Sequence, residues 1–248
     1  MDFVFVTSPL GLSLHGEPTD PLGQKDVRCM IIEMLGVAGA GKSSLRKALA
    51  RRNPRIQCVP PPNKLRYVPA LAEVGLFWWP IYRMRYPRSR GFTMQELRLI
   101  GYLETWLPHI RSLIRARGLI AVLDPGSIYW LAALQEFGPP LTQGPHFKQW
   151  WERKLRLWSC ALDIVVWLEA PPELLVRRVM ARDEWHEAKT QEPESALDTF
   201  RRFHTAYNRL ISQVMGYKAV KVLHYQTDQV STEQMVEEVL TEMGFGGR

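Results

Sequence analysis

Continuous apolar runs alternate along this chain with longer segments in which apolar residues recur every three or four positions. A short apolar run is typical of a strand buried on both faces, and the second pattern is typical of a helix that packs on a sheet. The runs predict strands at about 29–35, 55–59, 119–123, 163–168 and 220–224. The periodic segments predict helices at about 43–52, 94–117, 127–137, 145–160, 174–182, 193–215 and 232–243. Because strands alternate with helices, we expect an α/β protein with a parallel sheet and helices on both faces.

The helix at 94–117 has the clearest end signals. Thr93 precedes it as an N-cap, Glu96 follows three residues later as in a capping box, and Gly118 is suited to end it. Six apolar positions keep the helical period: Leu97, Ile100, Leu103, Leu107, Ile110 and Ile114. We therefore expect this helix to pack against the sheet.

Glycine and proline content predicts where the folded domain begins. Residues 1–28 are interrupted repeatedly by these two residue types, which predicts a flexible leader rather than a long regular element. Residues 29–248 are enough for a single domain with a substantial core.

Gly36 to Ser44 carry the pattern G-x-x-x-x-G-K-[ST] between the first predicted strand and the first predicted helix. Glycines in such a loop let backbone N–H groups turn inward, so that the loop and the helix N-terminus form a site for phosphate oxygens. Lys42 would reach the outer phosphates, and the Ser43 hydroxyl would bind Mg²⁺. An accidental glycine-rich turn is disfavoured because spacing, residue types and flanking elements agree. The residues expected to bind the nucleotide here are Gly36, Gly39, Ala40, Gly41, Lys42, Ser43 and Ser44.

Asp124 follows the predicted strand at 119–123, and ligands bind at the carboxyl edge of open α/β sheets. Its carboxylate could accept the proton of an attacking hydroxyl or order the water around Mg²⁺, which makes it a candidate catalytic and metal residue. Alternatively, Asp124 is the N-cap of a helix that starts at Pro125. Both roles are compatible with the sequence.

The chain has a formal net charge of +7, which favours anionic partners. This charge suits phosphate ligands, nucleic acid and acidic membranes equally, and a nucleic-acid partner, which rests on charge alone, is not expected. Cys29, Cys58 and Cys160 lack the spacing of a metal site or a disulfide framework, which indicates a reducing compartment. There is neither a signal-peptide pattern nor an apolar run long enough to span a bilayer, so we expect a cytoplasmic protein.

Leu162 to Arg182 read LDIVVWLEAPPELLVRRVMAR, a strand followed by a Pro-Glu pair and an arginine-bearing helix. Together with the phosphate loop and the Asp124 turn, this segment resembles the thymidylate-kinase-like branch of the P-loop kinases, which includes the deoxynucleoside kinases. The resemblance runs from about residue 29 to the C-terminus. It implies a three-layer α/β/α fold with a five-stranded parallel sheet, and a phosphate loop that follows a central strand.

The resemblance also implies that ATP is the phosphate donor, with Mg²⁺ as its cation. Arg178 would lie near the adenine, and Arg182 would reach the phosphates when a mobile lid at 183–192 closes. Lys42, Asp124 and Arg182 are then the candidate catalytic residues. The alternative for both arginines is a solvated face of an amphipathic helix, and Arg177 is expected at the surface.

Three features that thymidylate kinases use for their acceptor are absent. Asp124 is followed by Pro125 instead of arginine, the turn after the second strand reads Pro60-Pro61-Pro62, and no arginine stands at 103 or 104. The donor half of the site thus matches the family, and the acceptor half does not.

A carboxylate without the neighbouring arginine favours a neutral hydroxyl acceptor, such as a nucleoside, sugar or other small alcohol. A nucleoside monophosphate stays open, because other arginines could hold its phosphate: Arg83, Arg85, Arg88, Arg90 and Arg98. By resemblance, residues 64–94 cover the substrate, and the aromatic residues at 77–90 could stack on a ring. Those aromatics could instead pack in the core or, as a weaker alternative, contact a membrane surface. We expect an ATP-dependent small-molecule kinase, with a nucleotide-binding regulatory protein as the alternative. A homodimer is compatible with either.

Overall fold

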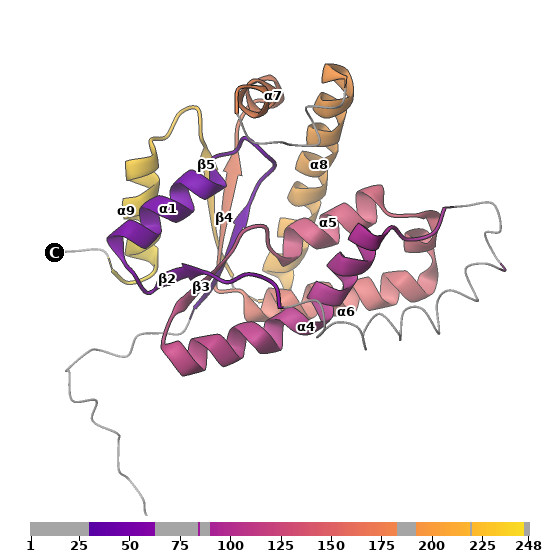
Figure 1. Ribbon diagram of the computed structural model, residues 1–248, viewed down its shortest axis with the longest axis horizontal. Helices are drawn as coiled ribbons and strands as arrows, with labels where there is room; N and C mark the ends of the chain where they lie inside the picture. The colour runs from indigo at the N-terminus through magenta and orange to yellow at the C-terminus, as the bar shows by residue number, and fades with distance from the viewer. Residues whose placement is uncertain (1–29, 63–83, 85–89, 183–191, 219, 246–248) are drawn as a thin grey trace, which may run out of the picture.

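The computed structural model describes residues 30–62, 84, 90–182, 192–218 and 220–245. Within these residues the chain forms one parallel sheet covered by helices (Figure 1). The strands are β1 (Ile31–Leu35), β2 (Ile56–Cys58), β3 (Ile120–Leu123), β4 (Ile164–Glu169) and β5 (Lys221–Gln226). The helices are α1 (Lys42–Arg52), α4 (Met94–Arg117), α5 (Ser127–Phe137), α6 (Pro145–Ala161), α7 (Pro172–Met180), α8 (Pro193–Tyr217) and α9 (Thr232–Glu242), with a 3₁₀ turn at Pro140–Gln143.

The five strands lie in the order β2-β3-β1-β4-β5, and every neighbouring pair is parallel. β1 is central, so that Ile32 aligns with Val122 of β3 on one side and with Ile164 of β4 on the other. All residues of β1 and β3 are buried, as their continuous apolar runs predicted. The five-stranded parallel sheet and the central strand before the phosphate loop are therefore confirmed.

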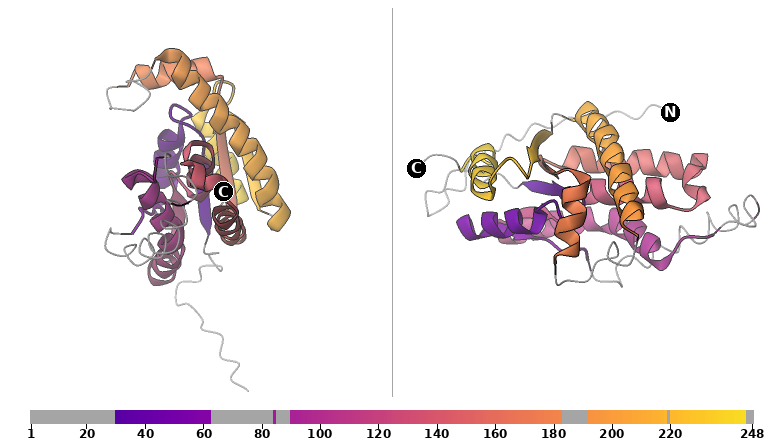
Figure 2. Two further views of the ribbon diagram at one scale, coloured as in Figure 1. Left: turned by 90° about the vertical axis from the view of Figure 1, so that its right-hand side faces the viewer. Right: turned by 90° about the horizontal axis from the view of Figure 1, so that it is seen from above.

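Two layers of helices cover the sheet, which confirms the three-layer α/β/α architecture. Helices α1 and α9 pack together on one face, and α4, α5, α6 and α8 form the other layer (Figures 1 and 2). The second layer has an aromatic interior, where the rings of Trp106 and Trp130 stack with centroids 4.6 Å apart and Trp158 is fully buried. None of the helices in the described part of the chain is long and apolar enough to cross a membrane.

The predicted helix ends are best confirmed at α4. The Thr93 side chain accepts from the Glu96 backbone N–H, and the Glu96 carboxylate accepts from the Thr93 N–H, so the capping box is complete. Gly118 ends the helix in the left-handed conformation, with a φ of 57°. Three predicted segments fall wholly or largely outside the described residues: the leader at 1–28, most of the substrate-covering region at 64–94, and all but the last residue of the lid at 183–192.

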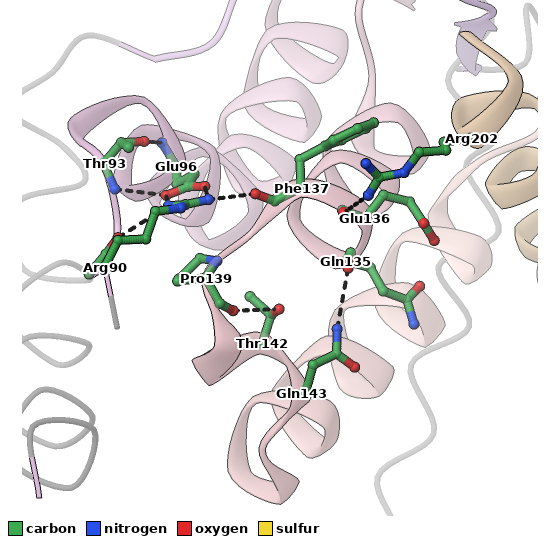
Figure 3. A network of polar contacts seen from close by, with 11 residues as sticks. Arg90, Thr93, Glu96, Gln135, Glu136, Phe137, Pro139, Thr142, Gln143 and Arg202 are labelled. Carbon is green, nitrogen blue, oxygen red and sulfur yellow. Dashed lines mark hydrogen bonds and ion pairs between the residues drawn. The ribbon is translucent and has the colours of Figure 1, made fainter. Parts of the chain in front are cut away.

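A polar network joins the start of α4 to the end of α5 (Figure 3). The Arg90 guanidinium donates to both carboxylate oxygens of Glu96, at 2.9 and 2.8 Å, and to the backbone carbonyl of Phe137 at 2.6 Å. Arg202 of α8 donates to the Glu136 carbonyl and lies over the Phe137 ring, 4.3 Å from its centroid. Arg90, one candidate for a phosphate clamp, thus joins α4 to α5, and Arg202 joins α5 to α8.

Candidate active site

The phosphate loop leaves β1 at Gly36 and enters α1 at Lys42, and its glycines are required by close packing and by backbone conformation. A side chain at Gly36 would place its Cβ 2.5 Å from the Leu168 carbonyl oxygen, and one at Gly39 would lie 2.8 Å from the Leu175 carbonyl oxygen. Gly41, the N-cap of α1, has a φ of 93°, which side chains rarely permit. No side chain of the described residues caps α1, so its first N–H groups are available for phosphate oxygens.

Lys42 lies folded back on the loop that contains it. Its Nζ donates to the backbone carbonyls of Gly36 at 2.7 Å and Val37 at 2.9 Å. Burial lowers the pKa of Lys42 to about 8; the Asp124 carboxylate opposes this effect, and the Arg182 guanidinium adds to it. The Asp124 carboxylate and the Arg182 guanidinium therefore both lie close enough to Lys42 to interact with it electrostatically.

Asp124 stands beside the start of α1. Its Oδ2 lies 3.5 Å from the Ser43 hydroxyl oxygen and 3.4 Å from the Arg46 Nε. A hydroxyl next to a carboxylate supplies the hard oxygen ligands that Mg²⁺ prefers, with water and phosphate oxygens completing the shell. The residues present therefore fit Mg²⁺ shared with a nucleotide. The described residues contain no cluster of three His, Cys, Asp or Glu side chains that could hold a metal by themselves.

Glu33, a residue to which the sequence pattern assigns no role, is fully buried in the middle of β1. Its Oε1 accepts from the backbone N–H groups of Ile128 at 2.8 Å and Tyr129 at 3.2 Å, and its Oε2 accepts from the Ser127 hydroxyl at 2.8 Å. Burial raises the pKa of Glu33 to about 7, although these hydrogen bonds oppose the shift. The lone charged residue within the apolar run at 29–35 was the available signal.

This arrangement corrects one prediction. Asp124 is not the N-cap of a helix starting at Pro125, because α5 starts at Ser127 with Gly126 as its N-cap and has no side-chain cap of its own. The Glu33 carboxylate, which comes from β1, accepts from the N–H groups that a cap would bind. The Asp124 side chain is thereby left directed at Ser43 and Arg46.

Arg178 connects the phosphate loop to the turn between β5 and α9. Its guanidinium donates to the Gly39 carbonyl at 3.3 Å, the Thr227 hydroxyl at 2.9 Å and the Thr227 carbonyl at 3.1 Å. It is therefore not a solvated arginine, whereas Arg177 is exposed, as expected. A cavity of about 390 Å³ lies here, and its lining residues include Gly39, Gly41, Ser44, Arg178, Arg182, Thr227 and Met235.

A more apolar cavity of about 410 Å³ lies where β4, α7 and α8 meet, with Trp167, Phe200 and Tyr207 in its lining. At its edge, Glu169 pairs with two histidines, through His204 Nε2 at 2.5 Å and His224 Nε2 at 2.7 Å. Gly36 and Val37 of the phosphate loop also line this cavity, and Asp124 is not among its described lining residues.

No family model and no curated protein matches this chain. Among solved structures, the chain is similar to deoxyadenosine kinase from M. mycoides with bound dCTP, at 11% sequence identity and a TM-score of 0.50. The similarity covers 87% of this chain and 99% of the other. The fold is that of a P-loop nucleoside kinase. The chain is also similar to the structure of the M. mycoides enzyme with products dCMP and dCDP, at 12% sequence identity and a TM-score of 0.48. This similarity again covers 87% of this chain and 99% of the other.

The site residues that the sequence predicted lie at the carboxyl edge of the sheet, on both sides of β1. Asp124 follows β3 on one side, and the β4–α7 and β5–α9 segments supply Arg178, Arg182 and Thr227 on the other. The structure therefore brings the predicted donor residues and Asp124 to one place. It adds Glu33 and Arg46, whose roles depend on contacts with residues distant in the sequence.

Proposed function

We propose that this protein is an ATP-dependent phosphotransferase that moves the γ-phosphate of ATP to a hydroxyl group of a small molecule. The observation that carries the proposal is the Asp124 carboxylate beside Ser43, at 3.5 Å, on the side of the phosphate loop opposite the Arg178 cavity. An ATP molecule bound in the Arg178 cavity would place its γ-phosphate at the phosphate loop, between this cavity and Asp124. An acceptor hydroxyl beside Asp124 would then lie next to the γ-phosphate.

Phosphoryl transfer depends mostly on positioning and on neutralising charge. The loop N–H groups, Lys42 and Arg182 would hold the β- and γ-phosphates, and Arg178 would support the adenine end of ATP. The acceptor oxygen attacks the γ-phosphorus, the bond to the β–γ bridging oxygen breaks, and ADP leaves. The hydroxyl proton passes to Asp124. Mg²⁺ held by Ser43, with Asp124 ordering its water, would neutralise charge on the phosphates.

Two residues of α4 support a neutral acceptor, because they stand where a phosphate acceptor would require a cation and neither is one. Leu103 is fully buried, and Glu104 accepts from Trp150 Nε1 at 2.6 Å and from Lys154 at 2.5 Å. Arg90 is engaged by Glu96 and the Phe137 carbonyl. We place nucleosides first among neutral acceptors, because the similar structure is that of a deoxyadenosine kinase.

A substrate panel with Asp124→Asn tests the proposal. ADP formation from MgATP is measured with nucleosides, nucleoside monophosphates, sugars and lipid alcohols. We expect turnover with a neutral alcohol, and a loss of kcat of about 100-fold or more in Asp124→Asn, since general bases contribute about 10²–10⁴-fold. The ATP Kd should change little. Asp198→Asn, on the exposed surface of α8, is the matched control.

Preferred turnover of a monophosphate, or full kcat in Asp124→Asn, would contradict the proposal. One observation favours the second candidate, a nucleotide-binding regulatory protein: Arg46 Nε lies 3.4 Å from the Asp124 carboxylate and pairs with it. Such a protein would bind ATP through Lys42 and show no turnover with any acceptor.

A further inference from the structure

We propose that Glu33 is a positioning residue for phosphotransfer: its buried carboxylate holds the first turn of α5, and thereby sets where the Asp124 carboxylate lies relative to the phosphate loop. The inference rests on the proposed function, because it assigns Asp124 a role in the reaction. Among the described residues, the hydrogen-bond partners of the Glu33 side chain are Ser127, Ile128 and Tyr129 of α5.

The distances around the Asp124 turn show which contacts fix it. Among the described residues, the Asp124 side chain has only long polar contacts, at 3.4 Å to Arg46 and 3.5 Å to Ser43. Glu33 makes two contacts of 2.8 Å with the residues just after this turn, to the Ser127 hydroxyl and the Ile128 N–H. The shorter bonds come from beneath the turn, so the turn is held through Glu33 and not through the Asp124 carboxylate.

The packing around Gly126 supports the same inference. A Cβ on Gly126 would lie 2.3 Å from Glu33 Cδ and 2.6 Å from Glu33 Oε2. The Glu33 carboxyl thus fills the space that a side chain at 126 would need. The turn and the carboxyl fit each other closely, and either one limits where the other can lie.

The position of Glu33 on β1 makes this contact relevant to the reaction. The same short strand continues directly into the phosphate loop at Gly36. A paired strand is rigid, so the loop and the Glu33 carboxylate keep a fixed separation. By holding α5, Glu33 fixes the position of the Asp124 turn relative to the phosphate loop.

Stability alone does not explain an acidic side chain here. Burying a carboxylate among apolar strands is costly, and apolar replacements of buried charges are often neutral or stabilising. An apolar side chain would, however, leave the Ile128 and Tyr129 N–H groups without their acceptor. The first turn of α5 could then shift, with Asp124 attached to it.

Two substitutions distinguish the effect of the Glu33 hydrogen bonds from the effect of its charge. Glu33→Met keeps the side-chain length but offers no strong acceptor, whereas the amide oxygen of Glu33→Gln can still accept from both backbone N–H groups. We expect kcat to fall at least 30-fold in Glu33→Met and about threefold or less in Glu33→Gln, with the KM for ATP nearly unchanged in both. Ile32→Val, in the same strand, is the control for a small core perturbation.

Hydrogen exchange of the α5 amides gives a readout that does not depend on turnover. Exchange at Ile128 and Tyr129 should speed up in Glu33→Met and stay slow in Glu33→Gln. A Glu33→Met protein with normal kcat, or a Glu33→Gln protein as impaired as Glu33→Met, would overturn the inference. So would an equal loss of ATP affinity and kcat in Glu33→Met, which would indicate a general disturbance of the loop.

Gly126→Ala provides an independent test if Glu33→Met folds poorly. The added methyl group should lower kcat in the wild-type background by displacing the Glu33 carboxyl. In the Glu33→Ala background the space is vacant, so Gly126→Ala should add little to the loss. Additive losses would contradict the coupling. If the wild-type protein transfers phosphate to no acceptor, the proposed function fails, and the exchange rates still decide whether Glu33 holds the turn.

Discussion

Lys42 Nζ donates to the backbone carbonyl of Gly36 at 2.7 Å, so the lysine expected to bind phosphate is hydrogen-bonded to its own loop. Val37 provides a second carbonyl at 2.9 Å, and both bonds stabilise the ammonium in a partly buried position. A nucleotide must compete with these carbonyls for Nζ. The loop is therefore shaped before ATP arrives, and its lysine is already near the phosphates it would contact.

The lowered pKa of Lys42 predicts how ATP affinity depends on pH. Since the pKa is about 8 in the unliganded protein, ATP affinity should be constant below pH 8. Above pH 8 the lysine loses its proton, and affinity should fall by up to about tenfold per pH unit. Calorimetric titration between pH 6.5 and 9.5 measures this. Lys42→Met should bind weakly at every pH, while Lys47→Met, an exposed neighbour on α1, should follow the wild type.

Glu33 predicts a pH dependence of folding stability. Its pKa is about 7 in the folded protein, above the ordinary value of 4.5, so the folded state binds more protons between these values. The free energy of unfolding should therefore fall as pH rises from about 4.5 to 7, by roughly 3 kcal/mol in total. The contribution of protonated Glu33 is fully present below this window and lost above it.

Urea unfolding of wild type and Glu33→Gln at pH 5, 6, 7 and 8 checks this dependence. The two proteins should have similar stability at pH 5, and Glu33→Gln should be the more stable at pH 8, because a glutamine cannot ionise. Tyr207 also faces this site, since Glu33 contributes to the raised pKa of its phenol, but the phenol stays protonated throughout the range. Parallel curves for the two proteins would refute the assignment.

Arg178→Ala should weaken ATP binding by about 10- to 100-fold, since hydrogen bonds from charged groups contribute about 1.5–3 kcal/mol. The substitution removes the three bonds that tie Gly39 to Thr227. Arg178→Lys should restore little, because an ammonium lacks the planar fork of donors. Arg177→Ala, on the exposed side of α7, should bind ATP like the wild type. Equal effects at 177 and 178 would argue against a specific role.

Cys58 offers a chemical probe of the acceptor side. Its thiol is partly exposed at the end of β2, close to Arg46 and Asp124, and burial raises its pKa. MgATP together with a productive acceptor should slow its alkylation at least threefold, while Cys160, exposed at the end of α6, should react at the same rate. Site-resolved mass spectrometry of the alkylated peptides measures both rates. Equal protection of the two cysteines would indicate a global effect.

Local patterns were sufficient for most of the fold. The apolar runs located the strands of the described sheet, and Thr93 with Glu96 marked the start of α4 because a capping box involves residues only three positions apart. The resemblance to known kinases implied five strands with the phosphate loop after a central one, and the order of the strands came from the structure. Periodicity alone identifies strands without saying which ones are neighbours.

The features of the site likewise divide into those set by local sequence and those set by contacts between distant elements. The sequence by itself determined the phosphate loop, because its conformation depends on glycines and on residues within nine positions of one another. Only the tertiary structure decided the setting of Asp124. A carboxylate from β1 and a guanidinium from α1 both meet the turn after β3, and such contacts form only when the sheet brings these elements together. Local reasoning offered a helix cap as one of two roles for Asp124, whereas Glu33, 91 positions earlier in the chain, is the residue that accepts from α5.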